Sequence, residues 1–420
     1  MPVTLLAALQ VAARVSTLGC AGFAYFTTPS GASYLGAANF WDGVSPDMSA
    51  SSVLYSVAPA AAGTNGSLAL AEVQRFPTQG AHGLDFFTTV DAQHSFLVIP
   101  NYYGCGEARG PAQGPCASTA VYRLAPPGSP DVFVPHQRLL TAGPAQTGHL
   151  LLSSGAALLL VGENFADQVC TYALQLPGGS FARQSHQPCL PVPGAGALAA
   201  AEAHGHAYLV AASYHDPHSG WETRSRVFRA PVPADPGAPL AWQPHQELPS
   251  QGAHGAHLRQ LGSQHLLVLA EDRGSAGPAQ HSTLYHLSAA TGRFELLQRL
   301  ATDGAHGARL FEGPGGQPYL AVANFGDRLG GRVAARSSLW RGSNSSSSSS
   351  SSSSGLFFER VAEVATQGAT DVEHWVGADG RHFVAIAEEG DIGKRRHQRS
   401  FVRELTSSQM GGKEPPKEEL

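Results

Sequence analysis

Short runs of apolar residues, each closed by a polar residue, recur along the whole chain. The clearest run extends from Tyr319 to Phe325 (YLAVANF) and follows the tetrapeptide Gly304-Ala305-His306-Gly307. Being apolar at nearly every position is typical of a strand that is buried on both faces. Equivalent runs recur at intervals of 49 to 64 residues, and their closing polar residues are Asn39, Asn101, Asn164, Ser213, Glu271, Asn324 and Glu388.

Each repeat contains more than this one run. A Gly-Ala opening precedes the run, a third segment ends in a large side chain, and a fourth carries a glutamine in five copies. The segments are about 5–8 residues long and are bounded by Gly, Pro, Asn or Ser, which are strand and turn signals. Four strands in each of seven repeats predict an all-β fold, a seven-bladed β-propeller with four-stranded blades.

The two ends of the chain predict how the ring closes. The last repeat ends after its third strand, near Val402, and residues 11–18 precede Gly19 as residues 296–303 precede Gly304. We therefore expect an N-terminal strand to complete the last blade and hide its edge. A signal peptide is the alternative for this apolar segment, although it lacks a positively charged start.

These patterns divide the chain into three parts. Residues 1–10 form a leader or signal segment, residues 11–406 the seven-repeat propeller, and residues 407–420 a polar flexible tail. Within the propeller, a serine-rich loop at residues 343–355 cannot bury apolar area and is expected to be disordered.

Composition excludes several classes of protein. Only 14% of the 420 residues are charged, while 48 are glycine and 29 are proline, which argues against a helical bundle or a coiled coil. The net charge of −5 offers no basic face for nucleic acid. No uninterrupted apolar stretch reaches 18 residues, so we expect no membrane span.

The repeat resembles the epilepsy-associated repeat, or epitempin (EPTP), family. The opening Gly368-Ala369-Thr370-Asp371-Val372-Glu373 and the run from Tyr319 to Phe325 carry the resemblance, which covers roughly residues 11–405. It implies a propeller that acts as a non-enzymatic protein-interaction module, with a cell-surface or extracellular protein as its partner. The resemblance does not identify that partner or the oligomeric state.

Aromatic residues in two long loops are the candidate binding anchors. Buried aromatic side chains dominate the energy of many protein interfaces. If the protein is a recognition module, the anchors lie on one rim of the ring, and they are Tyr102, Tyr103, Tyr214 and Trp221. The alternative role of each is to pack its own loop. An intracellular scaffold is a third reading of the same propeller.

Three histidines recur at one register, beside the entry to the innermost strand of their blades: His82, His254 and His306. In a propeller this register approaches the central channel, so the imidazoles are channel-entry candidates for binding a metal or an anion. The alternative is that they cap turns. No HExxH motif accompanies them, and the metal stays unknown.

The alternative function is a metal-binding or channel-active propeller enzyme of the hydrolase or lyase type. His306 with Asp303, or His254 with Glu271, could serve as a base and the group that orients it. No Gly-x-Ser-x-Gly elbow is present. No cofactor is expected, apart from calcium or another cation held at the channel by acidic residues near the closing positions.

The cysteines and several short motifs indicate the cellular compartment in which the protein resides. Cys105 with Cys116, and Cys170 with Cys189, are candidate disulfides, and Cys20 is left over. This arrangement favours an oxidising compartment. Two loop sequons, at Asn65 and Asn344, agree with a secreted glycoprotein. The C-terminal sequence KEEL resembles an endoplasmic-reticulum retrieval signal.

Overall fold

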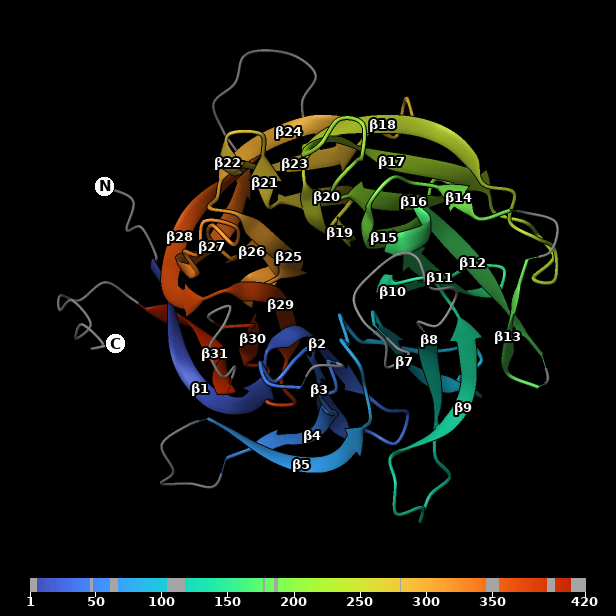
Figure 1. The fold of residues 1–420 in the computed structure, drawn as a ribbon, viewed down its shortest axis with the longest axis horizontal. Coiled ribbons are helices and arrows are strands. Elements are labelled where there is room, and N and C mark those ends of the chain that lie inside the picture. The colour runs from blue at the N-terminus through green and yellow to red at the C-terminus, as the bar shows by residue number, and fades with distance from the viewer. Residues whose placement is uncertain are drawn as a thin grey trace.

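The computed structural model describes residues 6–45, 48–60, 67–103, 118–176, 178–184, 188–279, 281–344, 355–390 and 397–408. Over these residues, seven antiparallel sheets lie around a common axis, each built on four strands (Figure 1). The strands follow one another from the inside of each blade to the outside. The predicted seven-bladed β-propeller is confirmed.

The first four blades take up the chain from Cys20 to Gln251. Blade 1 contains β2 (Cys20–Thr27), β3 (Ser33–Asn39), β4 (Ser52–Pro59) and β5 (Leu68–Phe76). Blade 2 contains β6 (Asp85–Thr88), β7 (Ser95–Asn101), β8 (Ser118–Leu124) and β9 (Phe133–Leu140). Blade 3 contains β10 (Pro144–Leu151), β11 (Ala157–Glu163), the short helix η1 (Asn164–Ala166), β12 (Gln168–Gln175), β13 (Ser180–Arg183) and β14 (Leu190–Pro191). Blade 4 contains β15 (Ala195–Ala203), β16 (His206–Ser213), β17 (Glu222–Pro231) and β18 (Gln243–Gln251).

The last three blades complete the ring. Blade 5 contains β19 (Ala253–Leu261), β20 (Gln264–Glu271), β23 (His281–Leu287) and β24 (Phe294–Ala301), and it carries the small hairpin β21 (Arg273–Gly274) and β22 (Gly277–Pro278). Blade 6 contains β25 (Ala305–Glu312), η2 (Pro314–Gly316), β26 (Pro318–Asn324), β27 (Ala334–Asn344) and β28 (Leu356–Gln367). Blade 7 contains β29 (Ala369–Val376), β30 (His382–Glu388), β31 (His397–Ser408) and the N-terminal strand β1 (Leu6–Leu18).

Strand β1 closes the ring, as the sequence predicted. It pairs antiparallel with β31 from Leu6 opposite Ser408 to Leu18 opposite His397. Val15 of β1 is fully buried in a cluster that joins blade 7 to blade 1. Since the first and last strands share one sheet, the ring is held shut by non-covalent pairing of distant parts of the chain.

The apolar runs form the second strand of each blade. Every residue of β7 and of β11 is buried, which agrees with a strand covered on both faces. The polar residue that closes this strand accepts a hydrogen bond from the backbone of the preceding segment. Asn324 accepts a hydrogen bond from the backbone N–H of Asp303 at 3.2 Å, and Glu388 accepts one from Gln367 at 3.0 Å. An amide and a carboxylate supply the same acceptor, so Asn and Glu can both close this strand. In blade 3 the residue at this register is Glu163, which ends β11, and the predicted Asn164 begins η1 instead.

The glutamines of the fourth strand connect neighbouring blades. Gln246 donates from Nε2 to the carbonyl oxygen of Phe294 at 2.8 Å, and its Oε1 accepts the N–H of the same phenylalanine at 2.9 Å. The same two-bond clamp recurs from Gln74 to Phe133, from Gln137 to Phe181 and from Gln298 to Phe358. Each glutamine therefore holds the main chain of the next blade's outermost strand.

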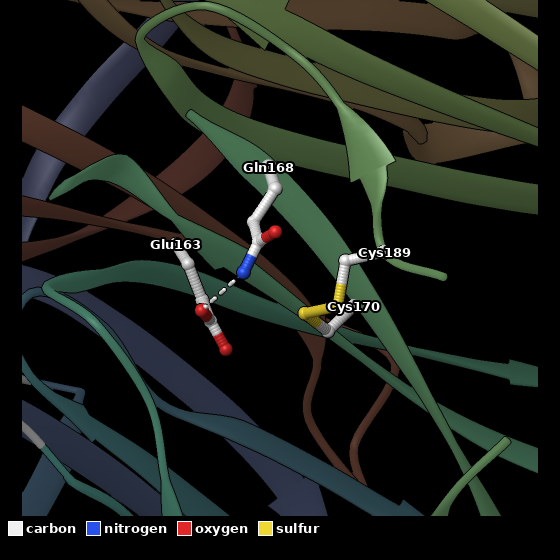
Figure 2. Close-up of a disulfide and its surroundings, with 4 residues drawn as sticks. All are labelled: Glu163, Gln168, Cys170 and Cys189. Atoms are coloured by element: carbon white, nitrogen blue, oxygen red, sulfur yellow. Dashed lines mark hydrogen bonds between the residues drawn. A yellow bond between two sulfur atoms is a disulfide. The ribbon is translucent and has the colours of Figure 1, made fainter. Parts of the chain in front are cut away.

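A disulfide joins Cys170 and Cys189 in blade 3 (Figure 2). It links β12 to the residue before β14, and Gln168 Nε2 donates to Glu163 Oε2 beside it at 2.9 Å. This predicted pair is confirmed, and Cys20 is a buried free thiol. Among the described residues, no helix is long and apolar enough to cross a membrane.

Several predicted features lie outside the described residues. These are the Cys105–Cys116 pair, the Asn65 sequon, most of the serine-rich loop and the KEEL sequence. Asn344 ends β27, but the rest of its sequon is outside the described chain as well.

Candidate functional site

A cavity of about 1000 Å³ follows the axis of the ring. The innermost strands of the blades converge on it, among them β2, β10, β15, β19, β25 and β29 (Figure 1). Its lining comes from side chains of these strands and from the loops that follow the second strand of several blades. We call these loops, with the residues they bring to the axis, the mouth, and the stretch around Asp85, His149 and Arg309 the floor.

The Gly-Ala-His-Gly opening has a physical basis in the way the inner strands approach one another. Its first glycine, Gly304, has φ +57°, a left-handed conformation that side chains disfavour. The second glycine permits close contact between blades. A Cβ atom on Gly255 would lie 2.6 Å from the carbonyl oxygen of His306, and one on Gly307 would lie 2.8 Å from the Cα of Asp371. The motif therefore places each histidine at the axis while the strands stay close.

The three predicted channel-entry histidines meet across the axis, although they come from blades 2, 5 and 6. The rings of His254 and His306 stack with their centroids 3.4 Å apart, and the ring of His82 lies 5.6 Å from that of His254. We call this constriction the histidine throat. Burial lowers the pKa of His82 to about 4 and holds the pKa values of His254 and His306 well below 6.5, so all three are neutral near pH 7.

The predicted aromatic anchors surround the mouth and are half-buried, so they do not form an exposed rim. The Tyr102 hydroxyl donates to Asn164 Oδ1 at 2.9 Å, and its ring lies 5.5 Å from His82. The Tyr214 ring lies 4.9 Å from that of His254 and 5.1 Å from that of Trp221. Loop packing against the histidine throat accounts for much of their burial.

The floor contains a histidine–carboxylate pair. The Nδ1 atom of His149, on β10, lies 2.9 Å from Asp85 Oδ1, on β6 of the neighbouring blade. About a third of the His149 side-chain surface is exposed, and both residues line the cavity. Burial alone would lower the pKa of His149, but the charge of Asp85 and its hydrogen bond outweigh it and raise the pKa above 6.5. Among the described residues, no group bonds to His149 Nε2.

Arg309, on β25, is the central cation of the floor. Its Nη2 atom lies 2.7 Å from Glu373 Oε1, while its buried Nε has no hydrogen-bond partner among the described residues. Its charge acts on His149 as well as on Asp371. Burial raises the pKa of Asp371 to about 6 and that of Glu373 to about 7, even though Arg309 opposes both shifts.

Arg259 adds a second positive charge to this end of the cavity. It lies on β19, lines the cavity and is exposed. It makes no hydrogen bond or ion pair with any residue in the described part of the chain, and partial desolvation of its guanidinium, together with the charge of Arg309, lowers its pKa. Both guanidinium groups line the cavity, and neither has all of its donors engaged, so they can bond to an anionic ligand.

The base-and-orienter pairs predicted from the sequence do not form. Asp303 accepts two hydrogen bonds from Arg332 at 2.7 Å, and Glu271 accepts the N–H of Gln251 at 3.0 Å. Both carboxylates are therefore engaged away from His306 and His254. The Asp85–His149 pair was missed because its members belong to different blades and 64 residues separate them. Aligning the seven inner strands would have placed Asp85 and Arg309 at one register. Three of the other blades carry a small residue there, and two carry an ionisable one: Ala24, Gly148, Ala199, His257 and Glu373.

Two acidic residues at the closing positions, Glu271 and Glu388, accept backbone N–H groups, and Glu163 accepts a hydrogen bond from the side chain of Gln168. Among the described residues, no group of three or more His, Cys, Asp or Glu side chains is placed to hold a metal ion. A cation at the channel stays a prediction.

Glu271 provides a test of these buried carboxyl groups. Burial raises its pKa from 4.5 to about 7, so folding disfavours the ionised form, and its contribution to stability falls as the pH rises from 4.5 to above 7. Glu271 accepts the N–H of Gln251 and the hydroxyl of Thr283. The E271Q amide can still accept the N–H of Gln251 through Oε1 and can donate from Nε2 to the hydroxyl oxygen of Thr283, and it does not ionise. The variant should therefore gain about 3 kcal/mol of stability relative to the parent between pH 4.5 and pH 8. Urea unfolding of both proteins across this range measures the gain, and a difference that does not change with pH would contradict it.

Comparisons with known proteins found similar folds but no similar sequence. No protein-family model and no curated protein sequence matches the chain. A solved structure described as a "putative 6-phosphogluconolactonase" from Bacteroides fragilis matches with a TM-score of 0.50 and 13% identity, over 84% of this chain and 85% of that one. Its counterpart from Bacteroides uniformis matches with a TM-score of 0.50 and 10% identity, over 82% and 85%. The periplasmic gluconolactonase PpgL of Pseudomonas aeruginosa is similar at a TM-score of 0.48 and 15% identity, over 76% and 80%.

These findings correct the functional interpretation of the sequence. The chain was expected to be a non-enzymatic protein-interaction module without catalytic residues, and that expectation is wrong. The solved propellers that share its architecture are named as lactonases. The aromatic side chains assigned to an interaction rim instead line the mouth of a cavity whose floor holds a histidine–carboxylate pair. The resemblance to the epilepsy-associated repeat family stays a prediction, since a ring of seven blades is compatible with it without being specific to it.

Proposed function

We propose that this protein is a hydrolase that opens a cyclic ester, a sugar-acid lactone, on the floor of the axial cavity. The observation that carries the proposal is the Asp85–His149 pair, which shares the cavity with the cation of Arg309. The names of the propellers that share the fold agree with this reaction class. A channel-active hydrolase is the function that the sequence analysis gave as the alternative to a protein-interaction module.

The residues of the floor divide the reaction between them. Asp85 holds the imidazole through Nδ1, so that Nε2 of His149 removes a proton from a water molecule. The hydroxide adds to the lactone carbonyl carbon, and Arg309 stabilises the oxyanion that forms. The bond between the carbonyl carbon and the ring oxygen then breaks, and the ring oxygen takes the proton back from His149. One water molecule is consumed, and the product is an open-chain hydroxy acid.

The guanidinium of Arg259 favours substrates that carry an anionic group. Arg259 has no partner among the described residues, so it is available for a phosphate or carboxylate group at the far end of the substrate. Near pH 7 an anionic sugar lactone, such as a 6-phosphogluconolactone, should therefore bind better than its neutral counterpart.

The experiment compares the hydrolysis of 6-phospho-D-glucono-1,5-lactone with that of D-glucono-1,5-lactone, measured by proton release at pH 7 and corrected for the spontaneous reaction. We expect catalysed turnover of the phosphorylated substrate. In R259Q its KM should rise by about tenfold, with a smaller effect on the neutral lactone, because one charge-assisted contact is lost. If the protein hydrolyses neither lactone faster than the spontaneous reaction does, the proposed reaction is wrong.

We further propose that the protein passes through an oxidising compartment. The Cys170–Cys189 disulfide supports this, since such bonds persist in secreted proteins and are rare in the cytosol. Intact mass of the protein from its native source, before and after reduction, tests the proposal. Fully reduced cysteines would contradict it.

A further inference from the structure

The mouth of the cavity differs in chemistry from the floor. It is lined by aromatic rings, including Phe40, Tyr103, Tyr214 and Trp221. Arg328 and Glu389 reach into the same space from the loops of blades 6 and 7. None of these residues takes part in the reaction assigned to the floor, so the mouth requires its own explanation.

Arg328 is the cation that reaches the cavity from the loops of the mouth. Only 28% of its side-chain surface is exposed, yet it makes no hydrogen bond with another described residue. Its Nη2 atom lies 3.6 Å from Glu389 Oε1, which is too far for a hydrogen bond. The guanidinium lies over the ring of Phe325, 5.4 Å from the centroid. The five N–H donors of the Arg328 guanidinium are therefore held in one plane and can donate to a ligand.

The charges of the mouth are nearly balanced. Glu389 is only 4% exposed on its side chain and raises the pKa of Arg328, as expected for an opposite charge nearby. Arg273 is paired with Asp327 at 2.9 Å. Burial raises the pKa of Asp272 to about 6, so this carboxyl group adds negative charge at pH 7. An anion therefore gains little here.

The histidine throat supplies further polar atoms at the base of the mouth. His306 is 4% exposed, and its Nε2 atom has no hydrogen-bond partner among the described residues. A buried polar atom without a partner is unfavourable unless a ligand or water satisfies it. The imidazole is neutral near pH 7, so it can donate to or accept from a ligand without adding charge.

We propose that the mouth is a second ligand site, which binds a neutral saccharide. A hydroxyl group both donates and accepts, so neighbouring hydroxyls can accept from the Arg328 fork and donate to Glu389 at the same time. The apolar face of a sugar ring packs on aromatic side chains, for which Trp221 and Tyr103 are placed. The site combines apolar walls with a few convergent polar groups, as ligand sites generally do.

The test measures binding of D-glucose, D-galactose, D-mannose and D-xylose by saturation-transfer NMR and by titration calorimetry. We expect at least one of them to bind with a dissociation constant on the order of 1 mM. W221A and R328K should each weaken that binding by about tenfold, since one removes the stacking surface and the other removes the planar fork. L329A is the matched control, because Leu329 lies beside Arg328 but is exposed to solvent, and it should bind like the parent.

Two results would overturn the proposal. One is that none of the four sugars binds at up to about 50 mM, far above the expected constant. The other is that a sugar binds equally well to W221A and R328K once both are shown by circular dichroism to be folded. H149Q separates this site from the proposed reaction, because it should leave sugar binding unchanged while it removes lactone hydrolysis.

Discussion

Replacing His149 with glutamine is expected to lower kcat/KM for the phosphorylated lactone by a factor of about 10² to 10⁴, the usual contribution of a general base. Glutamine has a similar length and can still bond to Asp85, so the floor should keep its shape. It cannot take a proton from water. The measurement is the initial rate of proton release with the parent and the variant on the alkaline plateau of the parent's pH profile, where the imidazole of the parent is neutral.

The pH profile of D85N provides a second readout of the same pair. The base must be unprotonated to act, so the activity of the parent rises with pH through the pKa of His149, which Asp85 holds above 6.5. Without that charge, burial lowers the pKa of His149, and the acidic limb of the profile should move to lower pH. The rate at the plateau should also fall, because the imidazole is no longer oriented.

A histidine on the surface is the control for these variants. His281 is exposed at the start of β23, and H281Q should retain the parent rate and the parent profile. An H149Q protein that is folded and retains more than about a tenth of the parent activity would exclude His149 as the general base.

Replacing Val15 with aspartate should destabilise the whole ring by at least about 3 kcal/mol, because it buries a carboxylate without a partner. Val15 is fully buried among residues of blades 7 and 1, where β1 completes the last sheet. The loss should appear as a lower urea midpoint for the single transition of the propeller, followed by circular dichroism.

Ser16 is the matched control, since it is the next residue of the same strand and is exposed. S16D should unfold within about 0.5 kcal/mol of the parent, as is usual for surface substitutions. Equal midpoints for V15D and the parent would mean that β1 does not close the ring in solution.

The architecture could be predicted because it depends on a pattern that is repeated seven times. An apolar second strand must be covered on both faces, and only a ring of neighbouring blades covers all seven copies. The closing strand followed from the same count, since one repeat lacked its fourth strand. The Cys170–Cys189 bond was predictable because both cysteines belong to one blade, so the repeat places them close together.

The floor of the cavity could not be predicted in the same way. Asp85 and His149 come from neighbouring blades, and Arg309 comes from a third, so no local spacing connects them. What brings them together is the convergence of the inner strands on the axis. The predicted histidines line the cavity at the axis as expected, but they are neutral near pH 7, and the ionisable pair of the cavity is formed by other residues.

The glutamine clamps between blades have a consequence for how such a protein can diversify. Each clamp bonds only to main-chain N–H and C=O groups of the next blade, and every residue except proline offers both. A duplicated blade can therefore change almost all of its side chains and still be held by its neighbour. This leaves the positions that face the axis free to diverge, so that one ancestral unit can supply an aspartate in one blade, a histidine in another and an arginine in a third.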